Sequence, residues 1–150
     1  MTALYLEDMF VGRRFSGGPV TVDRDAIKAF AREYDPQHFH LNEAAADASF
    51  FRGLAASGWH TAAMSMRMMV ESDLRPDGGV IGAGIEELQW PRAVRPGDVL
   101  RIELEVLEIT PSRSKPQQGI VRVAMNTFNQ ADEPVMHAVG RLVMFRRPAG

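Results

Sequence analysis

The sequence predicts one α+β domain spanning residues 1–150, with helices in the first half and antiparallel strands in the second. Three observations support this class: an amphipathic helical pattern near residue 30, a mostly apolar helical stretch near residue 65, and alternating apolar and polar residues after residue 99. A chain of 150 residues fits one domain and is long enough to bury a core. Helices followed by a run of strands are typical of α+β proteins.

The first predicted helix runs from Asp23 to Tyr34. Asp23 is a good N-cap residue, and apolar residues with the spacing of one buried face follow it: Ile27, Phe30, Ala31 and Tyr34. Pro36 ends the helix, because the residue before a proline is disfavoured in the α conformation. Asp35 is therefore expected where the helix gives way to a loop, a position from which a side chain can reach a site.

Two further helices are predicted before the sheet. Asn42 caps a short helix that ends near Ala48, and a longer helix runs from Gly58 to Glu71. The longer helix has apolar residues on most faces, which predicts burial nearly all round. Residues 77–79, Asp-Gly-Gly, form the turn that ends this region.

The second half of the chain reads as antiparallel strands. Leu100 to Val106 alternates apolar with charged residues, the period of a strand with one solvated face. Arg95 to Asp98, with proline second and glycine third, fits a type II turn before it. Further strands are expected over residues 80–90, 121–126 and 135–145, with a turn at 129–134.

Composition excludes several classes of function. A net charge of -2 gives no broad basic surface, so nucleic acid is not an expected partner. The chain has no cysteine, which excludes disulfides and thiolate nucleophiles and fits a reducing cytoplasm. The start of the chain lacks the pattern of a signal peptide, and the apolar stretch from Trp59 to Val70 is too short and too polar to span a membrane. We therefore expect a cytoplasmic protein.

The segment Tyr34-Asp-Pro-Gln-His-Phe-His40 carries the strongest candidate for chemistry. Asp35 and His40 are five residues apart at a break between helix and loop, so the two side chains can converge. A carboxylate and an imidazole that share a water molecule can move its protons in both directions. The alternative is that Asp35 caps a turn and His40 is an ordinary interior histidine.

Ser57 and Gly58 form a second candidate element at the start of the apolar helix. Glycine allows close approach to the backbone, and the first N–H groups of a helix lack partners within the helix. Such an N–H suits an oxygen that gains negative charge during a reaction. The alternative is that Gly58 only permits tight packing of helix against sheet.

Together these elements resemble the hydratase motif of the MaoC-like family of (R)-specific enoyl-CoA hydratases and dehydratases. That motif has an Asp, then Asn-Pro, and a His five residues after the Asp, with an oxyanion glycine about two dozen residues on, where this chain has Gly58. The resemblance covers nearly the whole chain. It implies a hotdog fold, in which a curved antiparallel sheet wraps around a central helix, with catalysis by Asp35, His40 and Gly58.

The resemblance also implies the reaction and its partners. Water adds to a trans-2-enoyl-CoA to give an (R)-3-hydroxyacyl-CoA, or the reverse, as in fatty acid metabolism. No metal or cofactor is required beyond the coenzyme A of the substrate. Residues flanking the motif are expected to contact substrate: Tyr34, Phe39, Ser57 and Trp59. The active site is expected at the interface of a homodimer, or of a larger assembly of dimers.

The chain departs from the usual motif in two respects. Proline directly follows Asp35, and Gln37 and His38 stand where the family has Asn and Pro. A serine that supports the catalytic Asp in the family falls near Met66 here, with Ser65 about 100° away on an ideal helix.

One compact basic loop, residues 111–116, is a candidate for binding the coenzyme A phosphates. Arg113 and Lys115 would act there, together with Arg92 and Arg95. The alternative is a surface loop without a ligand.

Other functions remain open at this point. A thioesterase on the same fold would use Asp35 or Glu71 to activate water, and a non-catalytic domain would only bind acyl-CoA. A metal site built from His38, His40 and His60 is a minor alternative, because their spacing matches no familiar ligand pattern.

Overall fold

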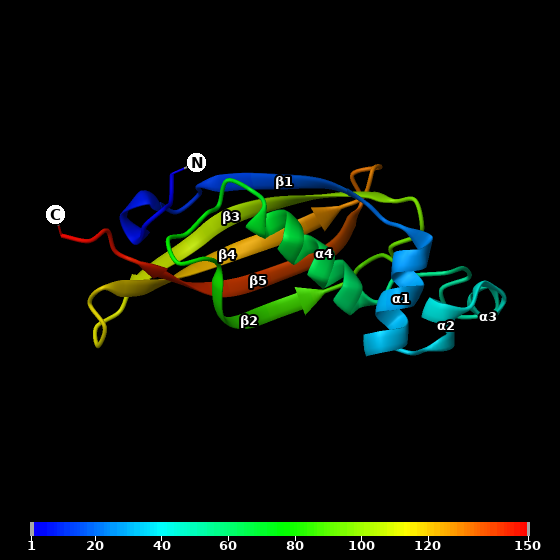
Figure 1. The fold of residues 1–150 in the computed structure, drawn as a ribbon. Helices are drawn as coiled ribbons and strands as arrows, with labels where there is room; N and C mark the ends of the chain where they lie inside the picture. The colour runs from blue at the N-terminus through cyan, green and yellow to red at the C-terminus, as the bar shows by residue number, and fades with distance from the viewer. Residues whose placement is uncertain (1, 150) are drawn as a thin grey trace.

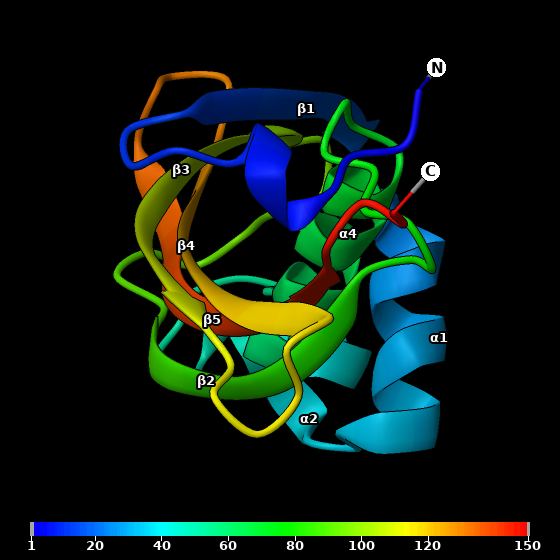
Figure 2. The same cartoon turned by 90° about the vertical axis from the view of Figure 1, so that its left-hand side faces the viewer.

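A computed structural model describes residues 2–149 of the chain. Five antiparallel strands form one curved sheet in the order β1-β3-β4-β5-β2, and the longest helix, α4, lies along its concave face (Figure 1). Seen end-on, the strands curl around α4, while α1 and α2 lie beside it (Figure 2). The predicted α+β class is confirmed.

The strands are β1 (Arg14–Thr21), β2 (Ile81–Gln89), β3 (Val99–Pro111), β4 (Gln118–Phe128) and β5 (Pro134–Phe145). The helices are η1 (Leu6–Asp8), α1 (Arg24–Tyr34), α2 (His38–Leu41), α3 (Glu43–Asp47) and α4 (Gly58–Val70). Each strand predicted in the second half of the chain is present and extends within a few residues of its expected bounds. The predicted turn before β3 is present too: the N–H of Asp98 bonds to the carbonyl of Arg95 at 3.1 Å, and Gly97 has φ +86°.

The core lies between α4 and the inner face of the sheet. Alternate residues of β3 point inward and are almost fully buried: Leu100, Ile102, Leu104 and Val106. From the helix, Met68 and Met69 pack into the same cluster. Full burial of one such side chain is worth about 1.5–3 kcal/mol, so this layer is a main source of the stability that fixes α4 on the sheet.

Strand β1 was missed by the sequence analysis, which placed all strands after the helices. Its Gly-Gly-Pro interior hides the alternation of a strand, and a register shift between Gly17 and Val20 breaks its pairing with β3. A Cβ at Gly17 would lie 2.6 Å from the carbonyl oxygen of Met68. Glycine at this position therefore lets β1 pass closely over α4.

Two expectations about burial were wrong. Tyr34, assigned to the buried face of α1, is 69% exposed at the last position of the helix, where its ring packs on Phe30 with centroids 5.1 Å apart; Ile27 and Ala31 are buried as expected. Helix α4 is not buried all round: Met66 is 46% exposed and Val70 52%. The sheet covers only one side of α4, so the opposite apolar residues remain uncovered in the single chain.

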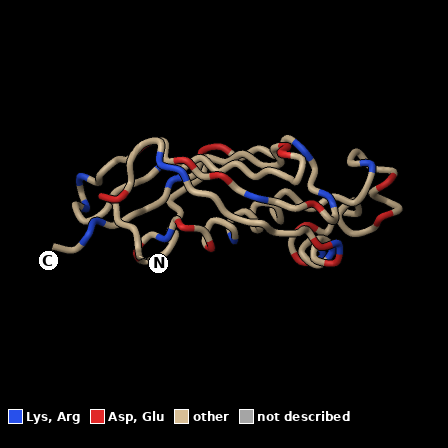
Figure 3. Tube along the Cα trace, turned by 90° about the horizontal axis from the view of Figure 1, so that it is seen from above, with Lys and Arg blue, Asp and Glu red and all other residues tan. Residues whose placement is uncertain are grey.

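Acidic and basic side chains are interspersed along the whole molecule rather than gathered on one face (Figure 3). Among the described residues, no helix is long and apolar enough to cross a membrane.

Candidate active site at the start of α4

Asp35 lies where the sequence places it, at the C-cap of α1. Its backbone N–H bonds to the carbonyl of Ala31 at 2.9 Å, and Pro36 then directs the chain out of the helix. The amide of Gln37 donates to Oδ1 of Asp35 at 2.5 Å. The residue at the position of the family's asparagine therefore orients the carboxylate.

His40 lies in α2, a single helical turn that the sequence analysis did not foresee. The imidazole is buried, with 5% of the side chain exposed, and Phe39 packs against it edge-to-face at 4.6 Å. Its Nδ1 lies 2.6 Å from the carbonyl oxygen of Ala55. A carbonyl oxygen can only accept a hydrogen bond, so Nδ1 carries a proton and Nε2 is the nitrogen available for chemistry.

The two side chains converge. Nε2 of His40 lies 3.3 Å from Oδ2 of Asp35, and the Asp35 side chain is 17% exposed. Partial burial raises the pKa of Asp35, but the Gln37 amide, the Ser57 hydroxyl and the attraction of His40 outweigh it and leave the pKa below the ordinary value. Asp35 is therefore ionised at neutral pH.

Gly58 begins α4 beside this pair. The Ser57 side chain caps the helix by accepting from the N–H of Trp59 at 3.2 Å, and the N–H of His60 bonds to the Ser57 carbonyl at 2.9 Å. Within residues 2–149, no group accepts a hydrogen bond from the N–H of Gly58. This donor is free at the positive end of the helix dipole.

A cavity of about 290 Å³ joins His40 to Gly58. Most of its wall is apolar, and the remaining lining residues are Phe50, Phe51, Ala56, Thr61, Trp90, Arg92, Ala93 and Val94. A pocket with apolar walls and few polar groups is typical of small-molecule sites. The cavity therefore offers room for an apolar group next to an acid–base pair and a free N–H.

The four predicted substrate-contact residues have different positions. Ser57 is fully buried between Asp35 and α4, and Phe39 packs behind His40. Trp59 is 57% exposed and makes an edge-to-face contact with Trp90 at 5.2 Å. None of these three lines the cavity, and neither does Tyr34. The nearest of them, Ser57 and Phe39, support the pair rather than form the cavity wall.

Ser65 does not support Asp35. Its hydroxyl donates to the Thr61 carbonyl at 2.8 Å and lies 2.7 Å from the hydroxyl of Thr127 on β4, fully buried. It thus fastens the helix to the sheet. The role that a serine on this helix plays in the family falls here to Gln37 and Ser57, which precede the helix body.

The basic residues are split between two places. Arg113 and Lys115 lie in the hairpin between β3 and β4, at the opposite end of the sheet from α1 and α2 (Figure 1). The structure does not bring them to Asp35 and His40 of the same chain. Arg92, by contrast, lines the cavity with His40, where it also pairs with Glu133 at 3.0 Å.

The metal alternative gains no support from the arrangement. His38 is exposed on α2, and the His60 ring stacks on that of Phe30 with centroids 4.7 Å apart. In the described part of the chain, no three His, Asp or Glu side chains are placed to share an ion.

Sequence reasoning missed the aromatic wall of the cavity. Phe50, Phe51 and Trp90 belong to loops whose positions depend on the fold. The only signal in the sequence was the aromatic pair at 50–51 between two helical patterns, where neither residue is needed for a core face.

A curved antiparallel sheet around one central helix, with an Asp–His pair at the helix start, defines a hotdog domain with the features of a catalytic site. The chain matches the family model described as "MaoC like domain" over residues 10–128. It therefore belongs to the MaoC-like domain family, as the motif predicted.

Three known proteins illustrate this membership. The chain is 53% identical to a MaoC-like dehydratase from Rhodospirillum rubrum, with a TM-score of 0.94 and coverage of 98% of this chain and 100% of that one. It is 26% identical to the R-hydratase PhaJ1 from Pseudomonas aeruginosa, with a TM-score of 0.77 over 97% and 88% of the two chains. It is also 32% identical to the uncharacterised protein YdeM of Bacillus subtilis, over 87% of this chain and 91% of that one.

Proposed function

We propose that this protein is a hydratase/dehydratase that adds water to a trans-2-enoyl-CoA to give an (R)-3-hydroxyacyl-CoA, or removes it. Membership in a family with a MaoC-like dehydratase and an (R)-hydratase among its solved structures supports the reaction type. The single observation that carries the proposal is the pairing of Asp35 with Nε2 of His40 at 3.3 Å, beside the free N–H of Gly58.

The geometry of the pair explains how it would hold a water molecule. Because Nδ1–H of His40 donates to the Ala55 carbonyl, the imidazole presents a lone pair on Nε2 whenever the ring is neutral. The ionised carboxylate of Asp35 also only accepts. A water molecule beside the pair can donate one O–H to each acceptor, which leaves its oxygen lone pairs for the substrate.

In the proposed reaction, the Asp35–His40 pair moves the protons and the Gly58 N–H stabilises the developing negative charge. The water oxygen forms a bond to the β-carbon of the substrate while one of its protons passes to the Asp35–His40 pair. The electrons of the double bond shift toward the thioester carbonyl, whose oxygen accepts from the Gly58 N–H. The pair then returns a proton to the α-carbon. The reaction needs no cofactor beyond the coenzyme A of the substrate.

The cavity supports an acyl-CoA as the substrate class. Its aromatic wall suits the acyl chain, and Arg92 at its edge suits an acidic group of coenzyme A. Arg113 and Lys115 belong to the β3–β4 hairpin, at the opposite end of the sheet from α1 and α2. We therefore assign them no role at the cavity of their own chain.

We further propose that the protein is a homodimer joined along β2. Strand β2 is a sheet edge, and its Ile85 is 63% exposed. The uncovered Met66 and Val70 of α4 add to the apolar surface of the chain. Open strand edges with apolar side chains are sites of pairing between chains, and a two-fold dimer pairs one such edge with its copy.

Light scattering during gel filtration tests the dimer. We expect a dimer for the parent protein at micromolar concentration, and a monomer after Ile85→Lys, which places a charge on the edge. Val11→Lys is the matched control, because Val11 is 66% exposed but lies outside every strand. A parent protein that is a monomer would contradict the proposal.

One assay separates hydration from the alternatives. The purified protein is incubated with crotonyl-CoA, and both the conjugated double bond and free thiol are followed. A hydratase consumes the double bond without releasing thiol, a thioesterase releases thiol, and a binding domain does neither. A thioesterase in this chain would have to use Asp35, because Glu71 pairs with Arg67 at the far end of α4, about 20 Å from Gly58.

A further inference from the structure

The tautomer of His40 depends on a loop that has no regular structure of its own. Residues 48–57 connect α3 to α4, and the Ala55 carbonyl within them accepts from Nδ1 of His40 at 2.6 Å. Two consecutive residues of the loop have positive φ, Arg52 at 55° and Gly53 at 153°. The N–H groups of Phe51 and Arg52 bond to Ser49 within the loop, but residues 53–55 form hydrogen bonds only to groups outside it. Contacts from outside the loop therefore fix the position of the Ala55 carbonyl.

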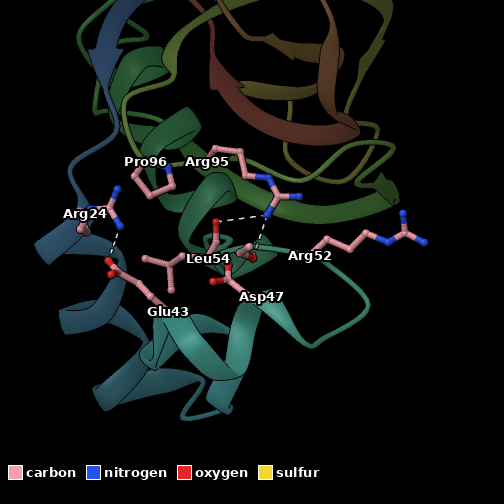
Figure 4. A pocket seen from close by; sticks show the side chains of 8 residues that line it. Arg24, Glu43, Asp47, Arg52, Leu54, Arg95 and Pro96 are labelled. Atoms are coloured by element: carbon pink, nitrogen blue, oxygen red, sulfur yellow. Dashed lines mark hydrogen bonds and ion pairs between the residues drawn. The ribbon is translucent and has the colours of Figure 1, made fainter.

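Arg95 holds this loop through its guanidinium group. Nη1 donates to the carbonyls of Gly53 at 2.8 Å and Leu54 at 3.3 Å, and Nη2 donates to the carbonyl of Phe51. Figure 4 shows the group reaching from the turn before β3 across to the loop. One side chain thus binds three carbonyls within the four residues before Ala55.

Hydrogen bonds to the turn before β3 fix the backbone of Arg95 in its place. Its backbone N–H bonds to the Asp98 carboxylate at 2.8 Å, and that buried carboxylate also accepts from the Gln130 amide at 3.0 Å. On the other side of Ala55, the N–H of Ala56 bonds to the carbonyl of Val94 at 2.9 Å. Adjacent residues of one rigid turn therefore hold the loop before and after the carbonyl that binds His40.

We propose that Arg95 is a positioning residue for His40. By fixing the loop, it keeps the Ala55 carbonyl on Nδ1, so that Nε2 stays free to face Asp35. The structural part stands on the contacts alone; the consequence for catalysis rests on the proposed hydratase function. The planar fork of arginine suits the task, because its N–H groups point in fixed and different directions, whereas an ammonium group is a compact point charge. This role replaces the expectation that Arg95 binds a coenzyme A phosphate.

The tautomer is read directly by long-range ¹H–¹⁵N NMR of the histidine rings in labelled protein. The chain has four histidines, and His40→Gln assigns the signal of His40. We expect the Nδ1–H pattern for His40 in the parent. We expect a shift toward Nε2–H or an average of the two in Arg95→Gln and also in Arg95→Lys, because neither can bind three carbonyls. A parent in which His40 carries its proton only on Nε2 would overturn the proposal without any variant.

Two controls separate this effect from general damage. His137 provides one in the same spectrum, because its Nδ1 lies 2.7 Å from Oδ1 of Asn126, far from the loop in sequence; its pattern must not change. Arg24→Gln is the other, because Arg24 and Arg95 both line a second cavity of about 470 Å³, separate from the one at His40, and Arg24 pairs with Glu43 there instead of with the loop (Figure 4). An unchanged His40 pattern in folded Arg95→Gln, or an equal change in Arg24→Gln, would overturn the proposal.

Kinetics then test the consequence. We expect Arg95→Gln to lower kcat about tenfold with little change in KM, as misplacement of a catalytic group does. An unchanged kcat despite an altered tautomer would refute the link to catalysis. A parent protein without hydratase activity would refute the proposed function, while the tautomer measurements would still decide the role of Arg95.

Discussion

The two ends of the sheet use their polar side chains in different ways. At the end near α1 and α2, the buried polar residues include His40, Ser57 and Asp98, and each of these has at least one hydrogen-bond partner. At the other end, Arg113 and Lys115 are exposed in the hairpin, and within residues 2–149 no group bonds to either side chain. Both ends carry charge, but Arg113 and Lys115 lack the partners that hold the buried residues in fixed positions.

The difference shows which polar residues can do chemistry. Burial is costly for a polar group unless partners compensate for lost water, so a buried and fully bonded group is held in one orientation. An exposed cation keeps its water and its freedom of movement. We therefore expect substitutions to have large effects at the first end and small effects at the second.

The largest effect is expected at the catalytic pair. Asp35→Asn removes the base at constant shape, and His40→Gln removes the imidazole; each should lower hydratase kcat by at least about 100-fold. The double variant should be scarcely worse than either single one, because both residues act on one water. Steady-state kinetics with crotonyl-CoA measures this, with circular dichroism as the check on folding. A folded Asp35→Asn variant with near-parent turnover would show that the mechanism is wrong.

The next effect is expected at Gly58. A Cβ there would lie 2.6 Å from the Trp90 ring, so Gly58→Ala must displace the ring while it keeps the backbone N–H. We expect kcat/KM to fall about tenfold through misplacement of the substrate. Adding Trp90→Ala to Gly58→Ala should recover part of the loss, because the new methyl group then has room. If Trp90→Ala gives no recovery, the contact between the new methyl group and the Trp90 ring is not the cause of the loss in Gly58→Ala.

A smaller effect is expected in stability against pH. The pKa of Asp35 is lowered in the folded protein, so its ionised form favours folding above the ordinary value of about 3.9. This contribution is lost as pH falls through the lower, folded pKa. The difference in urea midpoint between parent and Asp35→Asn should therefore be constant above about pH 5 and decline below about pH 4. A difference that is constant down to about pH 2 would contradict the lowered pKa.

The smallest effect is expected at the hairpin. Arg113→Ala with Lys115→Ala should leave both kcat and KM near the parent values, because the hairpin lies far from the cavity of its own chain. Arg92→Ala is the comparison, and should raise KM with little change in kcat, the pattern of lost uniform binding. A raised KM in the hairpin variant would mean that coenzyme A reaches this end, across a dimer interface.

Part of the site could be read from the sequence because it depends on local rules. Pro36 ends α1 at Tyr34 whatever surrounds it, which places Asp35 at the helix C-cap. The same holds for Asn42, whose side chain accepts from the N–H of Ala45 at 2.8 Å as a helix cap. Gly17 shows the opposite case. Nothing in the local sequence marks β1 as a strand, because a glycine is needed at this position to avoid a clash with the backbone of α4.

By itself, the sequence determined the α+β class and most of the elements, and it supplied Asp35, His40 and Gly58 as the candidate catalytic residues. Only the tertiary structure decided what holds them: Gln37 and Ser57 on the carboxylate, the Ala55 carbonyl on the imidazole, and the aromatic wall of the cavity. It also decided that Arg95 binds carbonyls and that the basic hairpin lies far away. Helix caps and helix breaks follow from neighbours in the chain, whereas hydrogen-bond partners 15 or 42 residues apart depend on how the whole chain packs.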